Sequence, residues 1–191
     1  MKINLRVVQL YHNNTELLYK AAKNDREAQR TLYEVHAPKM LSVCRYYVKD
    51  VQKAEEVMLN GFFKAFTNLT SFKNEGSFEG WLRKIMVRES ISFLRRQKQV
   101  EFSIEEVDLP HNYSNNIETD LEVNDIQQLI DDLPEGYKMV FVMYAIEGYK
   151  HSEIAKMLDI SEGTSKSQLF KARQLLQQKL KELNTTSYGT N

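Results

Sequence analysis

Apolar residues recur at intervals of three and four along the first half of the chain, which is the period of an amphipathic α-helix. Breaks fall at Asn24 and Asp25, near Pro38, at Lys49 and Asp50, and between Ser71 and Gly80. We therefore expect several helices between residues 14 and 98. Their core-facing positions comprise Leu32, Val35, Leu41, Cys44, Val48, Val57, Phe62, Phe66 and Leu69 in one stretch, and Trp81, Leu82, Ile85, Ile91 and Leu94 in the next.

This period is lost over residues 99–123, where a few apolar residues are scattered among acids, Pro110 and asparagines. Such a stretch is too long for a short loop inside one domain and predicts an extended linker. Helical spacing returns at about Leu121, pauses at residues 133–136 and continues to about Leu183, before a polar tail. The pattern predicts an all-α protein with two small helical domains, residues 1–98 and 124–183, an acidic linker (99–123) and a frayed tail (184–191).

A helix-turn-helix is predicted within the second domain. Residues 147–149 break one helix, Ser152 is a suitable N-cap for the next, and residues 159–161 form a tight turn in which Ser161 caps a further helix. Two short helices about a three-residue turn are typical of this DNA-binding motif, although an ordinary helical hairpin remains the alternative for the segment alone. The second helix places Leu169, Ala172 and Leu176 on one stripe, and Lys166, Ser167, Phe170 and Lys171 on the face left for DNA.

Charge is distributed unevenly, although the 191 residues hold 26 basic and 26 acidic side chains. Residues 1–98 carry 18 basic and 10 acidic side chains (+8), whereas residues 99–123 carry seven acidic ones and no basic one (−7). The helix predicted over residues 78–97 has one strongly basic face. Residues 150–181 are basic again, with 7 basic and 3 acidic side chains. Solvated helix faces would explain any one cluster, but two basic blocks flanking an acidic segment indicate charged partners.

Most enzyme and metal chemistry is excluded. A single cysteine, Cys44, rules out a disulfide framework, and its helical spacing favours burial over a redox role. The four histidines lack metal-ligand spacing, and no phosphate loop, nucleophile elbow or catalytic carboxylate pair is present. We expect no cofactor and no metal. The longest strongly apolar run, residues 139–146, is too short to span a membrane, which favours an intracellular protein.

Two sets of motifs resemble bacterial sigma factors. One set resembles region 4 and comprises Leu133-Pro134, Val140-Phe141, Glu147-Gly148-Tyr149, Glu153-Ile154-Ala155, Ile160-Ser161 and Gly163-Thr164 through Lys166-Ser167 to Arg173. The other set resembles region 2 and comprises Ala54-Glu55-Glu56-Val57, Phe62, Lys64-Ala65-Phe66 and Gly76-Ser77-Phe78-Glu79-Gly80-Trp81-Leu82. Their order, the acidic linker and the lack of a region 3 domain resemble the extracytoplasmic-function (ECF) group of the sigma-70 family, over about residues 15–182.

The resemblance implies a cytoplasmic, non-enzymatic initiation factor. Such proteins dock on core RNA polymerase, through the β′ clamp helices and the β flap, and read the −35 and −10 elements of promoter DNA. An anti-sigma factor is a further implied partner. The helix from Val51 to Thr67 would lie on the clamp helices, with Glu55, Glu56, Asn60 and Phe63 as polymerase-binding candidates. Of its aromatic residues, Phe62, Phe63 and Phe66 are expected in core and supporting contacts.

Residue by residue, the resemblance assigns two DNA-binding sets. For the −10 element, the loop over residues 72–77 would capture an unstacked base, which needs a stacking wall and polar groups for the base edge. That set comprises Phe72, Lys73 and Asn74, with Arg83, Lys84, Arg88, Arg95 and Arg96 on the DNA backbone. For the −35 element, the set comprises Thr164, Lys166, Ser167, Phe170, Lys171 and Arg173.

Several positions depart from the family pattern. Leu59 and Asn60 stand where Gln-Glu is common, Arg88 replaces an asparagine, Ser165 replaces a buried valine, and Gln168 and Lys171 occupy places where arginine is frequent. Gly61 costs its helix roughly 1 kcal/mol unless another group packs closely there. Trp81 lies on the apolar stripe, which favours packing over DNA stacking. Two other functions remain open: a sigma mimic that sequesters an anti-sigma factor, and a stand-alone helix-turn-helix repressor.

Overall fold

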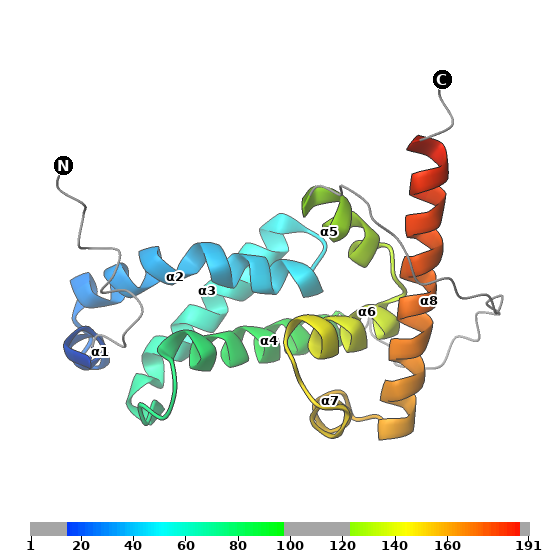
Figure 1. Ribbon diagram of the computed structural model, residues 1–191. Helices are drawn as coiled ribbons and strands as arrows, with labels where there is room; N and C mark the ends of the chain where they lie inside the picture. The colour runs from blue at the N-terminus through cyan, green and yellow to red at the C-terminus, as the bar shows by residue number, and fades with distance from the viewer. Residues whose placement is uncertain (1–14, 98–122, 188–191) are drawn as a thin grey trace. The chain divides into compact units, whose positions relative to one another are not determined.

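The computed structural model describes residues 15–97 and 123–187, and over these ranges every regular element is helical, with no strand (Figure 1). The chain divides into two compact units, Met1–Phe93 and Leu94–Asn191. The predicted all-α class is therefore confirmed. Almost all of the predicted linker and the end of the tail lie outside the described residues. No helix in the described parts of the chain is long and apolar enough to cross a membrane.

The first unit is built from α1 (Thr15–Ala22), α2 (Arg26–Tyr47), α3 (Val51–Thr67), the 3₁₀ turn η2 (Leu69–Ser71) and all but the last three residues of α4 (Phe78–Arg96). Aspartates cap the two middle helices: Asp25 accepts from the backbone N–H of Ala28, and Asp50 accepts from that of Lys53, each at 2.9 Å. These caps satisfy N–H groups that a helix start leaves unpaired. They confirm the helix breaks expected at Asn24–Asp25 and Lys49–Asp50.

The break expected near Pro38 is wrong, because α2 continues through it. Proline removes one helical hydrogen bond, but α2 buries Leu32 before it and Met40 and Val43 after it. Packing of both halves of α2 against the same core therefore outweighs the local cost. Helices α2 and α3 are in contact, and Figure 1 shows α3 running obliquely to α2.

The core of the first unit includes Met40, Tyr47, Leu82 and Met86, all fully buried. Gly61 of α3 lies where α4 approaches closely: a Cβ added there would stand 2.3 Å from Sδ of Met86. The glycine is thus explained by packing. Cys44 is buried, as expected.

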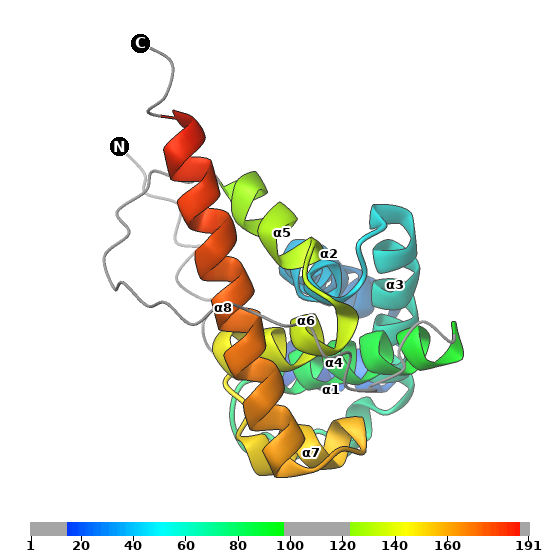
Figure 2. The same ribbon diagram turned by 90° about the vertical axis from the view of Figure 1, so that its right-hand side faces the viewer.

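The second unit contains α5 (Val123–Asp131), α6 (Glu135–Phe141), the π-helical turn η3 (Val142–Ile146), α7 (His151–Leu158) and α8 (Glu162–Ser187). Figure 2 shows α7 lying across the N-terminal end of α8. One core cluster joins Leu133, Tyr137 and Ala172, with Phe141, Leu175 and Leu176 packed on it. Helix α8 extends past the expected end at Leu183.

The predicted three-residue turn between α7 and α8 is confirmed. Asp159 ends α7 in the left-handed conformation, at φ 59°, and Ser161 Oγ accepts from the backbone N–H of Thr164 at 2.9 Å. The expected N-cap at Ser152 is wrong, because α7 begins at His151 and its N-cap is Lys150, two residues earlier than expected. There the N–H of Lys150 donates to Glu153 Oε2 at 2.8 Å. The glutamate thus accepts from the N–H of the N-cap residue itself, which is the N3 half of a capping box, and not from an N–H of the first turn as the serine would.

Candidate nucleic-acid interface

The first turns of α8 separate buried from exposed side chains as the helical spacing predicts. Leu169 and Ala172 are buried, while Lys166, Ser167, Arg173 and Phe170 (48% exposed) face solvent. Lys171 and Thr164 are half-buried: the ammonium of Lys171 lies 6.0 Å from the Tyr137 ring centroid, and the Thr164 hydroxyl lies 2.9 Å from that of Ser161. The exposed face combines cations, a hydroxyl and an aromatic ring.

A contact that the sequence reasoning missed holds α8 against α7. The buried hydroxyl of Ser165 lies 2.8 Å from Nδ1 of His151, and the His151 ring stacks on Tyr144 at 4.6 Å between centroids. The Arg173 guanidinium lies 5.8 Å from the centroid of Tyr144. Burial lowers the pKa of His151, and Lys166 and Arg173 lower it further, against the opposing effect of Glu162. A serine at a buried helical position was the available signal, since a buried hydroxyl needs a partner.

Gln168 stands where arginine is frequent in the family pattern, but it does not share the exposed face. Its side chain is buried against α6, where a Cβ on Gly136 would lie 3.1 Å from its Nε2. This position therefore contributes to packing inside the second unit.

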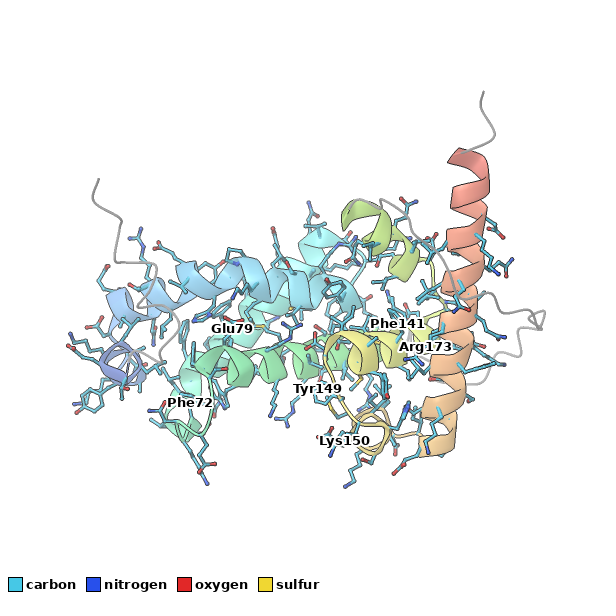
Figure 3. The ribbon with its side chains drawn as sticks, in the orientation of Figure 1. Phe72, Glu79, Phe141, Tyr149, Lys150 and Arg173 are labelled. Carbon is cyan, nitrogen blue, oxygen red and sulfur yellow. The ribbon has the colours of Figure 1, made fainter. Side chains whose placement is uncertain are left out.

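The loop over residues 72–77 is anchored at one end and exposed at its tip (Figure 3). Half-buried Phe72 packs on Phe78 and Trp81, with ring centroids 5.8 and 5.5 Å away. Lys73 and Asn74 are exposed, and Asn74 has a φ of 60°. Trp81 thus packs in an aromatic cluster, as predicted. The loop presents its polar side chains to solvent from an apolar base.

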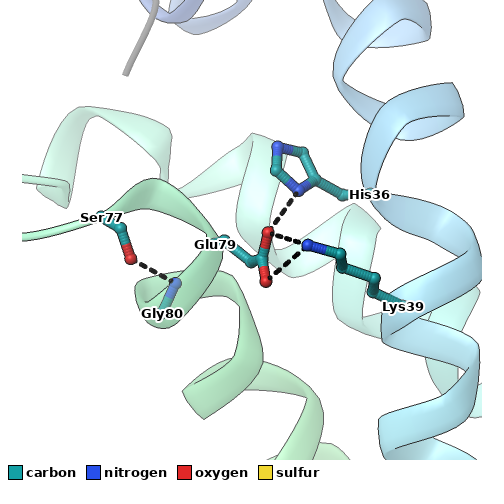
Figure 4. A network of polar contacts seen from close by, with 5 residues as sticks. All are labelled: His36, Lys39, Ser77, Glu79 and Gly80. Carbon is teal, nitrogen blue, oxygen red and sulfur yellow. Dashed lines mark hydrogen bonds and ion pairs between the residues drawn. The ribbon is translucent and has the colours of Figure 1, made fainter. Parts of the chain in front are cut away.

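Polar contacts fix the start of α4 to α2 (Figure 4). Glu79 accepts from Nζ of Lys39 at 3.0 and 3.2 Å, and its carboxylate lies 3.9 Å from Nδ1 of His36. Ser77 Oγ accepts from the N–H of Gly80 at 3.0 Å and caps the helix. Burial lowers the pKa of His36, which Glu79 partly offsets. These contacts hold the C-terminal end of the loop in place.

Helix α4 exposes a basic face along most of its length. Glu89, the acid in the middle of the helix, does not interrupt that face, because its side chain is 9% exposed and accepts from Nζ of Lys64 of α3 at 2.7 Å. The basic side chains comprise Lys84, Arg88, Arg95 and Arg96, all exposed, and Arg83, which is half-buried.

The outer face of α3 carries exposed acidic, amide and apolar groups. Glu55, Glu56 and Asn60 are exposed, and so are Leu59 (52%) and Phe63 (72%). The expectation that Phe63 packs into the core is wrong. Helical rotation points its neighbour, Phe62, inward and leaves Phe63 on the outer face, one turn beyond Leu59. This strip is apolar surface with no cover in the described residues.

Among the described residues, no group of three or more His, Cys, Asp or Glu side chains is placed to hold a metal ion.

Two family models match the chain, one mostly within the first unit and one within the second. Residues 32–100 match "Sigma-70 region 2", and residues 124–176 match "Sigma-70, region 4". The first match contains the exposed face of α3, the loop and the basic face of α4. The second contains α7 and the exposed turns of α8.

Curated relatives are similar over nearly their whole lengths. The ECF RNA polymerase sigma factor SigW of Bacillus subtilis is 27% identical over 177 residues, which cover 84% of this chain and 93% of that protein. The ECF RNA polymerase sigma factor SigM of Mycobacterium tuberculosis is 28% identical over 174 residues, covering 91% of this chain and 87% of that protein.

Solved structures share the fold. The sigma factor RpoE of Bartonella quintana, solved with the anti-sigma factor NepR, has a TM-score of 0.53 and 20% identity, covering 80% of this chain and 96% of RpoE. CnrH, solved with the cytosolic domain of CnrY, has a TM-score of 0.50 and 19% identity, over 87% and 96% of the two chains. With region 2 and region 4 matched in order and ECF factors aligned over most of their lengths, the chain belongs to the sigma-70 family of RNA polymerase sigma factors, in the ECF group.

Proposed function

We propose that this chain binds core RNA polymerase and directs it to promoters that carry paired −35 and −10 elements. As a sigma factor it is an initiation factor and not an enzyme. The observation that carries the proposal is the exposed face of α8, where cations, a hydroxyl and an aromatic ring follow a helix-turn-helix turn. That is the chemistry needed to meet phosphates and base edges in the major groove.

In this proposal α8 reads the −35 element. Lys166 and Arg173 supply charge, and Ser167 and Phe170 supply a hydroxyl and an apolar edge. Thr164 and Lys171 contribute at the margins, because both are half-buried. Lysine is a point charge and cannot make the bidentate pair of hydrogen bonds by which arginine recognises guanine. We therefore expect weaker direct readout at Lys171 than the family's arginine would give.

The first unit reads the −10 element in the proposal. Lys73 and Asn74 supply polar groups at the loop tip, and the half-buried ring of Phe72 supplies an apolar wall for a flipped base. The basic face of α4 holds the DNA backbone through Arg83, Lys84, Arg88, Arg95 and Arg96. Because these contacts displace counterions, promoter affinity should fall steeply as salt rises.

Polymerase docking is proposed for the outer face of α3, on the β′ clamp helices. Glu55, Glu56 and Asn60 offer polar contacts, and Phe63 with Leu59 offers apolar surface. Burying a large apolar side chain contributes about 1.5–3 kcal/mol, so Leu59 compensates in apolar area for the polar pair that the family pattern has here. The second unit would contact the β flap.

We propose a cytoplasmic location and an anti-sigma partner. Core polymerase and promoter DNA are cytoplasmic in bacteria, and the RpoE structure shows that an anti-sigma factor binds a chain of this fold. Such a partner would cover surfaces that polymerase or DNA needs. The domain limits 1–98 and 124–183, the acidic segment between them and the tail from 184 belong to the same proposal.

The test is reconstituted transcription with core polymerase from the same source on fragmented genomic DNA, followed by mapping of transcript starts. We expect discrete starts that share a spaced two-element motif. Lys166→Glu and Arg88→Glu should each abolish most of these starts, because each places a carboxylate against phosphate. Arg26→Glu is the matched control: it makes the same charge change at an exposed residue outside the proposed interfaces and should leave the starts intact.

Two results would contradict the proposal. Failure to form a complex with core polymerase would exclude the sigma function and favour a sequestering mimic. Starts that persist in both charge-reversal variants would exclude the assigned DNA faces.

A further inference from the structure

The hydroxyl of Ser165 is buried inside the second unit at a position where the family pattern has an apolar side chain. It lies 2.8 Å from Nδ1 of His151, which is the first residue of α7. The backbone N–H of Ser165 is already used in α8, where it donates to the carbonyl of Ser161. A buried hydroxyl needs an acceptor, and Nδ1 of His151 is one in the neutral tautomer that carries its ring proton on Nε2.

The ring of His151 is also held by stacking. Its plane lies 22° from that of Tyr144, at 4.6 Å between centroids, and Tyr144 lies beneath the guanidinium of Arg173. One imidazole therefore connects η3, α7 and the turns of α8 from which Lys166 and Arg173 project. Neither Ser165 nor His151 needs to touch DNA to influence how those cations are presented.

We propose that His151 is a positioning residue for the recognition helix: its neutral imidazole accepts the Ser165 hydrogen bond and seats the first turns of α8 against α7. We call the packing of these turns against α7 through the Ser165–His151 contact the seating of α8. Its effect on DNA binding rests on the function proposed above, whereas the seating itself does not. Ser165 and His151 act as one unit, which replaces the apolar contact that valine makes in the family pattern.

The charges around the ring predict how the seating depends on pH. Tyr144 faces the ring from η3, and Glu162, Lys166 and Arg173 act on it from α8. Burial is the largest effect lowering the pKa of His151, followed by Lys166. Protonation places a hydrogen on Nδ1, removes the acceptor and adds a cation beside two others. The seating is therefore present above the ordinary histidine pKa and is lost as the pH falls toward the lowered value.

The test uses the full chain and amide hydrogen exchange over the first turns of α8. At pH 7.5, His151→Phe should lower the protection of these amides about five- to tenfold, because phenylalanine keeps a ring but leaves the buried Ser165 hydroxyl without its acceptor. Ser165→Ala should have a smaller effect. The double variant should recover part of the loss of His151→Phe, since no donor is then left unsatisfied. Ser152→Ala, a serine of α7 outside this contact, is the control and should not change protection.

A pH profile separates this role from simple packing. Wild-type protection should fall between pH 7.5 and 5.5, and the profile of the double variant should be flatter. Losses that multiply in the double variant, or identical pH profiles, would overturn the proposal. Affinity for a promoter found by start mapping is measured in parallel, and His151→Phe should lower it about fivefold. If protection behaves as expected but the wild type binds no promoter, the proposed function fails and the positioning role stands.

Discussion

Gly61 shows how a single residue can be costly for its own helix and favourable for packing against another. Glycine weakens a helix interior, yet here Sδ and Cε of Met86 occupy the space in which a side chain would begin. The sequence revealed the cost but not the neighbour, which lies 25 positions further along the chain. Ser165 and His151 are a second case: the odd serine was visible, and its partner was visible only in three dimensions.

Gly61→Ala is expected to destabilise the first unit by about 1–2 kcal/mol, because overpacking outweighs the gain in helix propensity. The measurement is denaturant unfolding in the wild-type and Met86→Ala backgrounds. Once Met86 is truncated, the added methyl group has room, and Gly61→Ala should be neutral or stabilising. An equal loss of stability in both backgrounds would exclude the contact as the cause.

The pKa of His36 should respond to its ion-pair neighbour in a defined direction. Burial lowers that pKa and Glu79 opposes the shift, so Glu79→Gln should lower it further. The pKa of His36 is lower in the folded state than its unfolded value of about 6.5. His36 therefore favours the folded state above a pH of about 6.5, and this contribution is lost as the pH falls from there through the folded-state pKa. The ring signal in NMR titrations measures the shift directly. A higher pKa in Glu79→Gln would contradict the assignment.

Three helix starts were predictable because a capping side chain marks each of them, whereas Ser152, a residue of the same type, caps no helix. Asp25, Asp50 and Ser161 each accept a hydrogen bond from their helix, and all three breaks were visible in the sequence. Pro38 and Phe63 were misread for a common reason. Local preference and composition suggested a break at one and burial at the other, whereas the packing of the whole helix decides both.

The contact between α3 and α4 should depend on the ion pair of Lys64 with buried Glu89. Lys64→Met leaves a carboxylate with little solvent and no cation, and we expect a loss of about 1–2 kcal/mol, moderated because Lys64 is half exposed. Adding Glu89→Met should restore most of the stability. Unfolding experiments measure both effects. Lys20→Met breaks an exposed pair with Glu16 and should change nothing measurable; a similar loss there would show that the effect is not specific to burial.

At the scale of the molecule, the all-α class followed from spacing, and the two family regions followed from motifs in the right order. Both rest on local features of the chain. Which side chains of α8 are exposed was predictable in outline, because helical rotation alone places Lys166, Ser167 and Phe170 outward. What could not be predicted is which helix packs on which, and therefore that Gln168 is buried and that Glu89 lies off the basic face.

The outer strip of α3 has a thermodynamic consequence for the free chain. Leu59 and Phe63 remain in water, and a partner that covers them in this arrangement selects the folded first unit. By mass action, a ligand at 100 times its dissociation constant stabilises the form it binds by about 2.7 kcal/mol. Thermal midpoints measured against a panel of candidate proteins would therefore rank partners by occupancy. The same linkage gives the unpartnered chain a shorter lifetime against proteases than the occupied one.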